Sequence, residues 1–172
     1  MKFLKYLFRL KPDFSIDGII TDLSIEILKN NNIKGLILDL DNTIIASKAG
    51  ILDDEIKSWL KQAQNNEIKL IVVSNNNNST YLKQIEPILK ELDIELIGKA
   101  CKPFSKNLKK AIQILDLPVE NICLIGDRVL TDILGGVNLN MKTALVKPLI
   151  GDKENIIYKN LRKLEYIFLY KS

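Results

Sequence analysis

The stretch Gly35-Leu-Ile-Leu-Asp39-Leu-Asp41-Asn-Thr43 joins an apolar run to two carboxylates. The run does not alternate with polar residues, which is typical of a parallel strand buried on both faces. Residues two apart in a strand point the same way, so Asp39 and Asp41 can share one site if the backbone stays extended. Two neighbouring carboxylates are costly unless a cation or a proton lies between them. The stretch therefore predicts a strand that ends in an acidic site.

Further apolar runs resemble buried strands, and segments with helical spacing separate them. The expected strands cover 35–40, 68–74, 94–97, 121–126 and 143–146, and the expected helices cover 53–65, 79–92 and 105–115, with Asp53 and Ser79 as N-caps. This alternation predicts an α/β fold, a three-layer Rossmann-like domain with a mainly parallel five-stranded sheet. The length of 172 residues favours a single domain over residues 1–172.

Polar residues follow the other expected strands where those strands end. Ser74-Asn75 follows the second strand, Lys102-Pro103 the third, and Gly126-Asp127 the fourth, with Thr131-Asp132 shortly after. Ligands of open α/β sheets bind beyond the carboxyl ends of the strands. We expect these side chains to converge with Asp39 and Asp41, although Lys102 taken alone would more often be a solvated surface charge.

The composition excludes several kinds of chemistry. The chain has no histidine, which removes Ser-His-Asp catalysis, Cys-His catalysis and histidine-bound zinc. A metal would then be held by oxygen, which favours Mg²⁺. The net charge of +4 is too mild to indicate nucleic acid as a partner.

Other residue types favour structural roles. Cys101 and Cys123 are expected as free thiols that fill the core, Trp59 as a packing residue, and Gly135-Gly136 as a turn or close-packing site. No segment approaches the roughly 20 unbroken apolar residues that span a bilayer, and the N-terminus lacks the features of a signal peptide. A cytoplasmic location is expected.

Taken together, the residues at the strand ends resemble the four motifs of the haloacid dehalogenase (HAD) superfamily, subclass IIIA, over roughly residues 33–148. Asp39 to Thr43 matches the first motif, Ser74 the second, Lys102 the third, and Asp127 with Asp132 the fourth. The resemblance implies a HAD-like hydrolase fold and phosphatase chemistry.

The resemblance also implies a role for each motif residue. Asp39 would be the nucleophile that becomes phosphorylated, and Asp41 the general acid and base. Ser74 and Lys102 would contact the phosphoryl group, with Thr43 and the backbone or side chain of Asn75 also on the substrate. Mg²⁺ would be held by Asp39, the Asp41 carbonyl oxygen and Asp127, with Asp132 in support.

The segments between the motifs leave no room for a cap domain. Each of the stretches 43–74 and 75–102 holds one expected helix and one expected strand. The site should therefore be open to solvent, which suits a large or surface-held substrate. In this respect the chain resembles the compact YqeG-type and phosphatidylglycerophosphate phosphatase family, with Ile-Val-Val-Ser-Asn-Asn-Asn and the stretch 126–136 as further shared features. That resemblance implies hydrolysis of phosphatidylglycerophosphate to phosphatidylglycerol and phosphate.

Both ends of the chain mix basic residues with aromatic and aliphatic ones. Residues 1–12 and 158–171 carry this composition, which is typical of an interfacial membrane segment. We expect the N-terminal segment to contact a membrane, with packing on the domain as its alternative. The substrate would be an anionic phospholipid, and the protein would be peripheral at the inner face of a membrane. Two other functions stay open: a phosphatase for a soluble ester or phosphoprotein, and a non-catalytic regulatory or binding module with the same fold.

Overall fold

The apolar run before Asp39 forms strand β2, Gly35–Leu38, in the middle of a parallel sheet. The computed structural model describes residues 10–46 and 50–149. Within them the sheet has the order β1-β6-β5-β2-β3-β4, with all paired strands parallel. The other strands are β1 (Phe14–Ser15), β3 (Lys69–Val73), β4 (Glu95–Ile97), β5 (Ile122–Gly126) and β6 (Lys142–Leu145).

The sheet differs from the expectation at one edge. The expected strands are confirmed, each within two residues at its ends, but β1 adds a sixth strand beside β6. Its pairs, Phe14 with Ala144 and Ser15 with Leu145, span two residues. A strand of this length shows no periodicity, so the sequence pattern could not reveal it.

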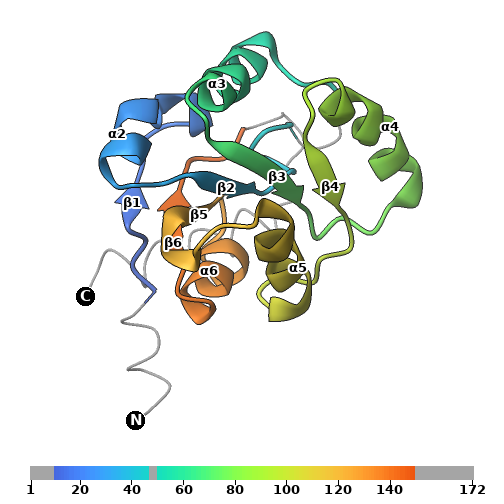
Figure 1. Cartoon of the computed structure of the whole chain (residues 1–172). Coiled ribbons are helices and arrows are strands. Elements are labelled where there is room, and N and C mark those ends of the chain that lie inside the picture. Colours follow the sequence, from blue (N-terminus) through green and yellow to red (C-terminus); the bar gives the residue numbers. More distant parts are fainter. Residues whose placement is uncertain (1–9, 47–49, 150–172) are drawn as a thin grey trace.

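Helices cover both faces of the sheet and make three layers (Figure 1). Helices α2 (Ile25–Asn30), α3 (Asp54–Asn65) and α4 (Ser79–Lys90) pack on one face, and α5 (Ser105–Leu115) and α6 (Leu134–Asn138) on the other. Short 3₁₀ turns lie at Ile20–Asp22 and Val119–Asn121, and a π-helical turn at Val129–Ile133 leads into α6. Asp53 caps α3 as expected, accepting from the Glu55 backbone N–H at 2.9 Å.

The expected cap of α4 is wrong by one residue. Asn78, not Ser79, is the N-cap, and its Oδ1 accepts from the backbone N–H groups of Thr80 and Tyr81 at 3.1 and 3.2 Å. An asparagine oxygen satisfies N-terminal amides as well as a serine does, so composition alone does not choose between them.

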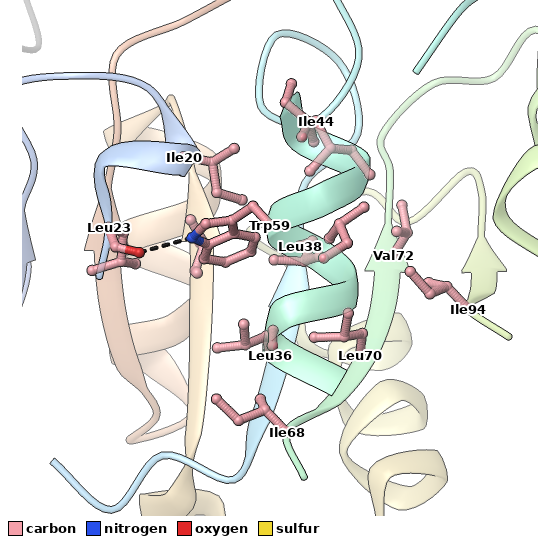
Figure 2. Close-up of a cluster of buried hydrophobic side chains, with 14 of the residues drawn as sticks. Ile20, Leu23, Leu36, Leu38, Ile44, Trp59, Ile68, Leu70, Val72 and Ile94 are labelled. Carbon is pink, nitrogen blue, oxygen red and sulfur yellow. Dashed lines mark hydrogen bonds between the residues drawn. The ribbon is translucent and has the colours of Figure 1, made fainter. Parts of the chain in front are cut away.

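The larger core lies between the sheet and α3 (Figure 2). Trp59 packs there against the leucines of β2 and β3, and its indole N–H donates to the Leu23 carbonyl oxygen at 2.8 Å. The expectation that Trp59 is a packing residue is therefore confirmed. On the opposite face, a Cβ added to Gly136 would lie 2.4 Å from Thr143 Cγ2, so this glycine allows α6 to pack closely on the sheet.

The strand order makes a topological switch point at the carboxyl edge of the sheet. The chain passes from β2 through α3 to β3 on one side, and later returns through α5 to β5 on the other side of β2. The space beyond the ends of β2 and β5 is thus a topological switch point, where α/β sheets bind ligands. One helix separates β2 from β3 and one separates β3 from β4, so no cap domain is inserted there within the described residues.

Within residues 10–46 and 50–149, no helix combines the length and the apolar character needed to cross a bilayer. The membrane segments expected at 1–12 and 158–171 lie almost wholly outside the described residues, so those expectations remain predictions.

Candidate active site

Three carboxylates gather at the switch point. Asp39 directly follows β2, and its backbone N–H donates to the Ile125 carbonyl oxygen of β5 at 2.9 Å. Asp39, Asp127 and Asp132 each offer one carboxylate oxygen, and these oxygens all lie within 4.8 Å of one another. All three residues are buried, with exposed fractions of 8%, 3% and 1%. The structure therefore brings the first and fourth acidic motifs together.

Lys102 places its ammonium group among these carboxylates. Its Nζ lies 2.6 Å from Asp39 Oδ1 and 2.8 Å from Asp132 Oδ1, and the residue is 4% exposed. Burial alone would lower the pKa of Lys102, but the charges of Asp132 and Asp39 outweigh it and raise that pKa. The lysine is therefore charged at neutral pH, and it is not the solvated surface residue that its type alone would suggest.

The cluster is rich in carboxylate oxygens. Asp39, Asp127 and Asp132 share a buried site with the Lys102 ammonium. Burial, with Asp39 beside it, raises the pKa of Asp132 although Lys102 opposes the shift. The donor set consists of oxygen alone, which is the preference of Mg²⁺ and similar hard ions. The residues thus fit a divalent cation, because three carboxylates offer oxygen ligands within reach of one another.

Asp41 lies beside this cluster in a separate environment. The Ser74 hydroxyl donates to Asp41 Oδ2 at 3.4 Å, and the Asn76 amide donates to the same oxygen at 3.1 Å. Burial raises the pKa of Asp41, and the charge of Asp39 adds to the shift, while Asn76 opposes it. A carboxyl with a raised pKa holds a proton more readily at neutral pH, which suits a general acid.

Asn75 fixes the loop that carries Lys102. Its Nδ2 donates to the Lys102 carbonyl oxygen at 3.0 Å, and its Oδ1 accepts from the Lys102 backbone N–H at 2.6 Å. The Asn75 side chain is thus occupied by the Lys102 backbone. Of the two substrate contacts expected for Asn75, the one through its backbone remains.

Cys101, next in this loop, is exposed with φ 56°, so the expectation that it fills the core is wrong. Cys123 is buried as expected, and neither cysteine forms a disulfide.

Thr43 and Gly126 support the carboxylates from behind. Thr43 is fully buried, and its hydroxyl donates to Asp39 Oδ2 at 3.4 Å. A Cβ added to Gly126 would lie 2.3 Å from the Asp132 carboxyl carbon, so only glycine leaves room for that side chain. The Arg128 backbone N–H donates to Asp132 Oδ2 at 3.2 Å. These contacts orient Asp39 and Asp132. The expected contact of Thr43 with a substrate stays a prediction.

Comparison with known proteins agrees with this geometry. The family model described as HAD-hydrolase-like matches residues 99–160. Over 164 residues the chain is 31% identical to Probable phosphatase YqeG of Bacillus subtilis (strain 168), covering 95% of this chain and 85% of that protein. The chain belongs to the HAD-like hydrolases.

Solved structures share the fold of this HAD-like hydrolase at low sequence identity. A HAD-superfamily hydrolase from Ehrlichia chaffeensis superposes with a TM-score of 0.53 at 13% identity, over 79% of this chain and 97% of that one. An uncharacterised protein from Corynebacterium glutamicum gives 0.55 at 17% identity, over 81% and 96%. The three-layer, capless α/β architecture expected from the sequence is therefore confirmed.

Two residues near Asp41 in this HAD-like hydrolase were not expected from the sequence. Asn76 belongs to a run of four asparagines, 75–78, which has the composition of an ordinary loop. Tyr81, in the first turn of α4, has a buried hydroxyl that faces Asp41, and burial together with the Asp41 charge raises the pKa of Tyr81. Its spacing of four from the buried Ile85 is the one sequence signal that directs it inward.

Proposed function

We propose that this HAD-like hydrolase is a magnesium-dependent phosphatase that acts through an aspartyl-phosphate intermediate on Asp39. The observation that carries the proposal is the buried Asp39 carboxylate, held 2.6 Å from the Lys102 ammonium within a cluster of oxygen ligands. The Bacillus subtilis relative is named as a probable phosphatase, which supports the same chemistry.

The first half-reaction uses Asp39 and Asp41. A carboxylate oxygen of Asp39 forms a bond to phosphorus while the bond from phosphorus to the leaving oxygen breaks. Asp41, whose pKa is raised by burial, gives its proton to that leaving oxygen. The Ser74 hydroxyl and the Lys102 ammonium are the donors available to the phosphoryl oxygens.

The second half-reaction reverses the role of Asp41. Now ionised, it takes a proton from a water molecule whose oxygen attacks phosphorus, and the bond between phosphorus and Asp39 breaks. Inorganic phosphate leaves, and both aspartates return to their starting states.

A divalent ion fits beside these residues. Asp39 and Asp127 would hold it through their carboxylates and Asp41 through its carbonyl oxygen, while Asp132 supports the site through Lys102. When bound, Mg²⁺ offsets the repulsion between the carboxylates and the phosphate.

The proposed substrate is phosphatidylglycerophosphate, an anionic phospholipid, with phosphatidylglycerol and phosphate as products. Its support is twofold: the chain resembles the capless phosphatases that act on this lipid, and the described residues place no inserted domain over the carboxyl edge of the sheet. In this proposal a site without an inserted cap domain admits a head group that stays attached to a membrane. In this proposal residues 1–12 help the protein to bind a membrane surface.

The test is release of phosphate by purified full-length protein with Mg²⁺, from phosphatidylglycerophosphate in mixed micelles and from p-nitrophenyl phosphate. We expect turnover of both, with the lipid preferred, and Asp39→Asn should remove turnover of both. An Asp39→Asn variant that keeps wild-type activity would refute the assignment of Asp39 as the nucleophile.

The two substrates separate the possible outcomes. If the protein hydrolyses p-nitrophenyl phosphate but not the lipid, the substrate would instead be a soluble ester or a phosphoprotein. Binding of Mg²⁺ without turnover of either ester would indicate a non-catalytic module.

A further inference from the structure

A large aromatic side chain lies in solvent close to the site. Phe104 is 74% exposed, whereas the other aromatic residues of the described part of the chain, Phe14, Trp59 and Tyr81, are partly or fully buried. Exposing a phenylalanine in water forgoes the stabilisation that its burial would give. Packing among the described residues does not bury it.

The local structure gives Phe104 no reason to be aromatic. It occupies the N-cap position of α5 and makes no side-chain hydrogen bond to the helix. Serine, threonine, aspartate and asparagine are the residues that stabilise this position. A residue that is unfavourable both for the helix and for solvent indicates a function.

Phe104 belongs to the segment that carries Lys102 into the candidate active site. It follows Lys102 by two residues, and the Lys102 ammonium is ion-paired with Asp39. Leu130, 43% exposed, lies in the π-helical turn Val129–Ile133, which also contains Asp132. Helix α6 follows this turn and begins close to the Phe104 segment, since a Cβ added to Gly135 would lie 3.6 Å from Pro103 Cα.

The stretch of sequence that contains Phe104 is basic. Residues 96–115 contain five lysines and no acidic residue. Lys102 is buried among the carboxylates, and the others are exposed: Lys99, Lys106, Lys109 and Lys110. An exposed aromatic flanked by lysines is the composition with which proteins bind the interface of an anionic membrane.

We propose that Phe104 and Leu130, with Lys99 and Lys106, form a docking surface for an anionic phospholipid bilayer. The inference rests on the proposed function, because it explains how a head group held in a membrane reaches Asp39. The apolar side chains enter the interface while the lysines bind lipid phosphates.

The test compares full-length wild type with Phe104→Ser and with Ile114→Ser. Ile114 is also exposed, at 39%, but it lies at the other end of α5. Binding is measured by sedimentation with vesicles of phosphatidylglycerol and phosphatidylcholine, and with vesicles of phosphatidylcholine alone. Phe104→Ser should weaken binding to the anionic vesicles by about tenfold. Ile114→Ser should bind within about twofold of wild type, and no variant should bind the neutral vesicles strongly.

Two further readouts separate docking from folding and catalysis. Phe104→Ser should hydrolyse p-nitrophenyl phosphate at a rate within about twofold of wild type, and its unfolding temperature should equal or exceed that of wild type, because serine is a better N-cap. Lys99→Gln combined with Lys106→Gln should weaken anionic-vesicle binding and make it less sensitive to salt.

Several outcomes would overturn the proposal. It fails if Phe104→Ser binds anionic vesicles as wild type does, or if the wild type binds neutral vesicles equally well. It also fails if Phe104→Ser instead abolishes self-association, which would identify this face as a contact between two copies of the chain. If wild type hydrolyses no phosphate ester but its vesicle binding depends on Phe104, the docking surface stands and the phosphatase proposal falls.

Discussion

At the scale of single residues, the proposed role of Asp41 as acid and base depends on the groups that donate hydrogen bonds to its carboxylate. Asp41 accepts from Ser74 and Asn76, and the buried Tyr81 hydroxyl faces it. These groups set the direction of the carboxyl group and oppose the effect of burial on its pKa. A general acid must be within hydrogen-bond reach of the leaving oxygen, so its orientation matters as much as its pKa.

Asn76 offers a direct test of this orientation. Asn76→Ala removes the amide that donates to Asp41 Oδ2 at 3.1 Å, and we expect kcat on p-nitrophenyl phosphate to fall by roughly 10-fold to 100-fold with little change in KM. The neighbouring Asn77 is exposed and provides the matched control, because Asn77→Ala should stay within about twofold of wild type. Equal losses in both variants would mean that the loop as a whole matters and not the contact with Asp41.

The two thiols provide a second residue-scale prediction. Cys123 is fully buried, and burial raises the pKa of its thiol, whereas Cys101 is exposed. Because the thiolate is the reactive form, a disulfide reagent should modify Cys101 of the native protein rapidly and Cys123 only as the protein opens. Cys101→Ser should remove the fast phase and keep the slow one. A fast phase that survives in Cys101→Ser would contradict the packing of β5.

Residue types at the strand ends predict the candidate site well, and their supporting contacts poorly. Asp39 and Asp127 can be found because carboxylates after apolar strands are conspicuous, whereas Lys102 and Asp132 were assigned by their resemblance to the HAD motifs. Asn75 and Asn76 cannot be assigned separate tasks from a run of four asparagines. Their different partners, the Lys102 backbone and Asp41, depend on the conformation of the loop.

At the scale of elements, α4 begins where an asparagine, not a serine, accepts the free amides of its first turn. Asn78→Ala should lower the free energy of unfolding by about 1 kcal/mol, because the Thr80 and Tyr81 amides lose their acceptor. Ser79→Ala should change it by less than about 0.5 kcal/mol, since Ser79 lies inside the exposed first turn. Urea unfolding monitored by circular dichroism measures the free energy of unfolding of both variants. A larger loss in Ser79→Ala than in Asn78→Ala would identify Ser79 as the cap.

Long elements with clear periodicity follow from the sequence, and short ones do not. Helices α3 and α5 have apolar residues at helical spacing over 12 and 11 residues, and both are predicted within one residue. The two-residue β1 and the five-residue α6 are too short to show a period. Their positions depend on packing: β1 pairs with the edge of β6, and the glycines of α6 lie against Leu108 and Thr143.

At the scale of the whole molecule, the strand order explains why residues far apart in the chain meet. Asp39 and Asp127 are separated by most of the domain, yet β2 and β5 are neighbours in register, with Leu38 opposite Ile125. The alternation of strands and helices predicts a parallel sheet, but it does not by itself give the order of the strands. Predicting that these residues converge therefore depended on the general rule that ligands bind at the carboxyl edge of such a sheet.

The convergence also predicts that a divalent ion stabilises the whole fold. Three carboxylates come together in this cluster only in the folded state, so an ion that binds them stabilises that state alone. With free Mg²⁺ at 100 times its Kd, linkage gives about 2.7 kcal/mol, or a rise of about 5–10 °C in Tm. Asp127→Asn removes one of the proposed ligands, so its Tm should rise little on addition of Mg²⁺. Asp116→Asn, an exposed change in the left-handed cap of α5, should keep the full response. Equal responses of Tm to Mg²⁺ in Asp127→Asn and wild type would mean that the ion binds elsewhere, and the acidic cluster would then have to be stabilised by protons or by Lys102 alone.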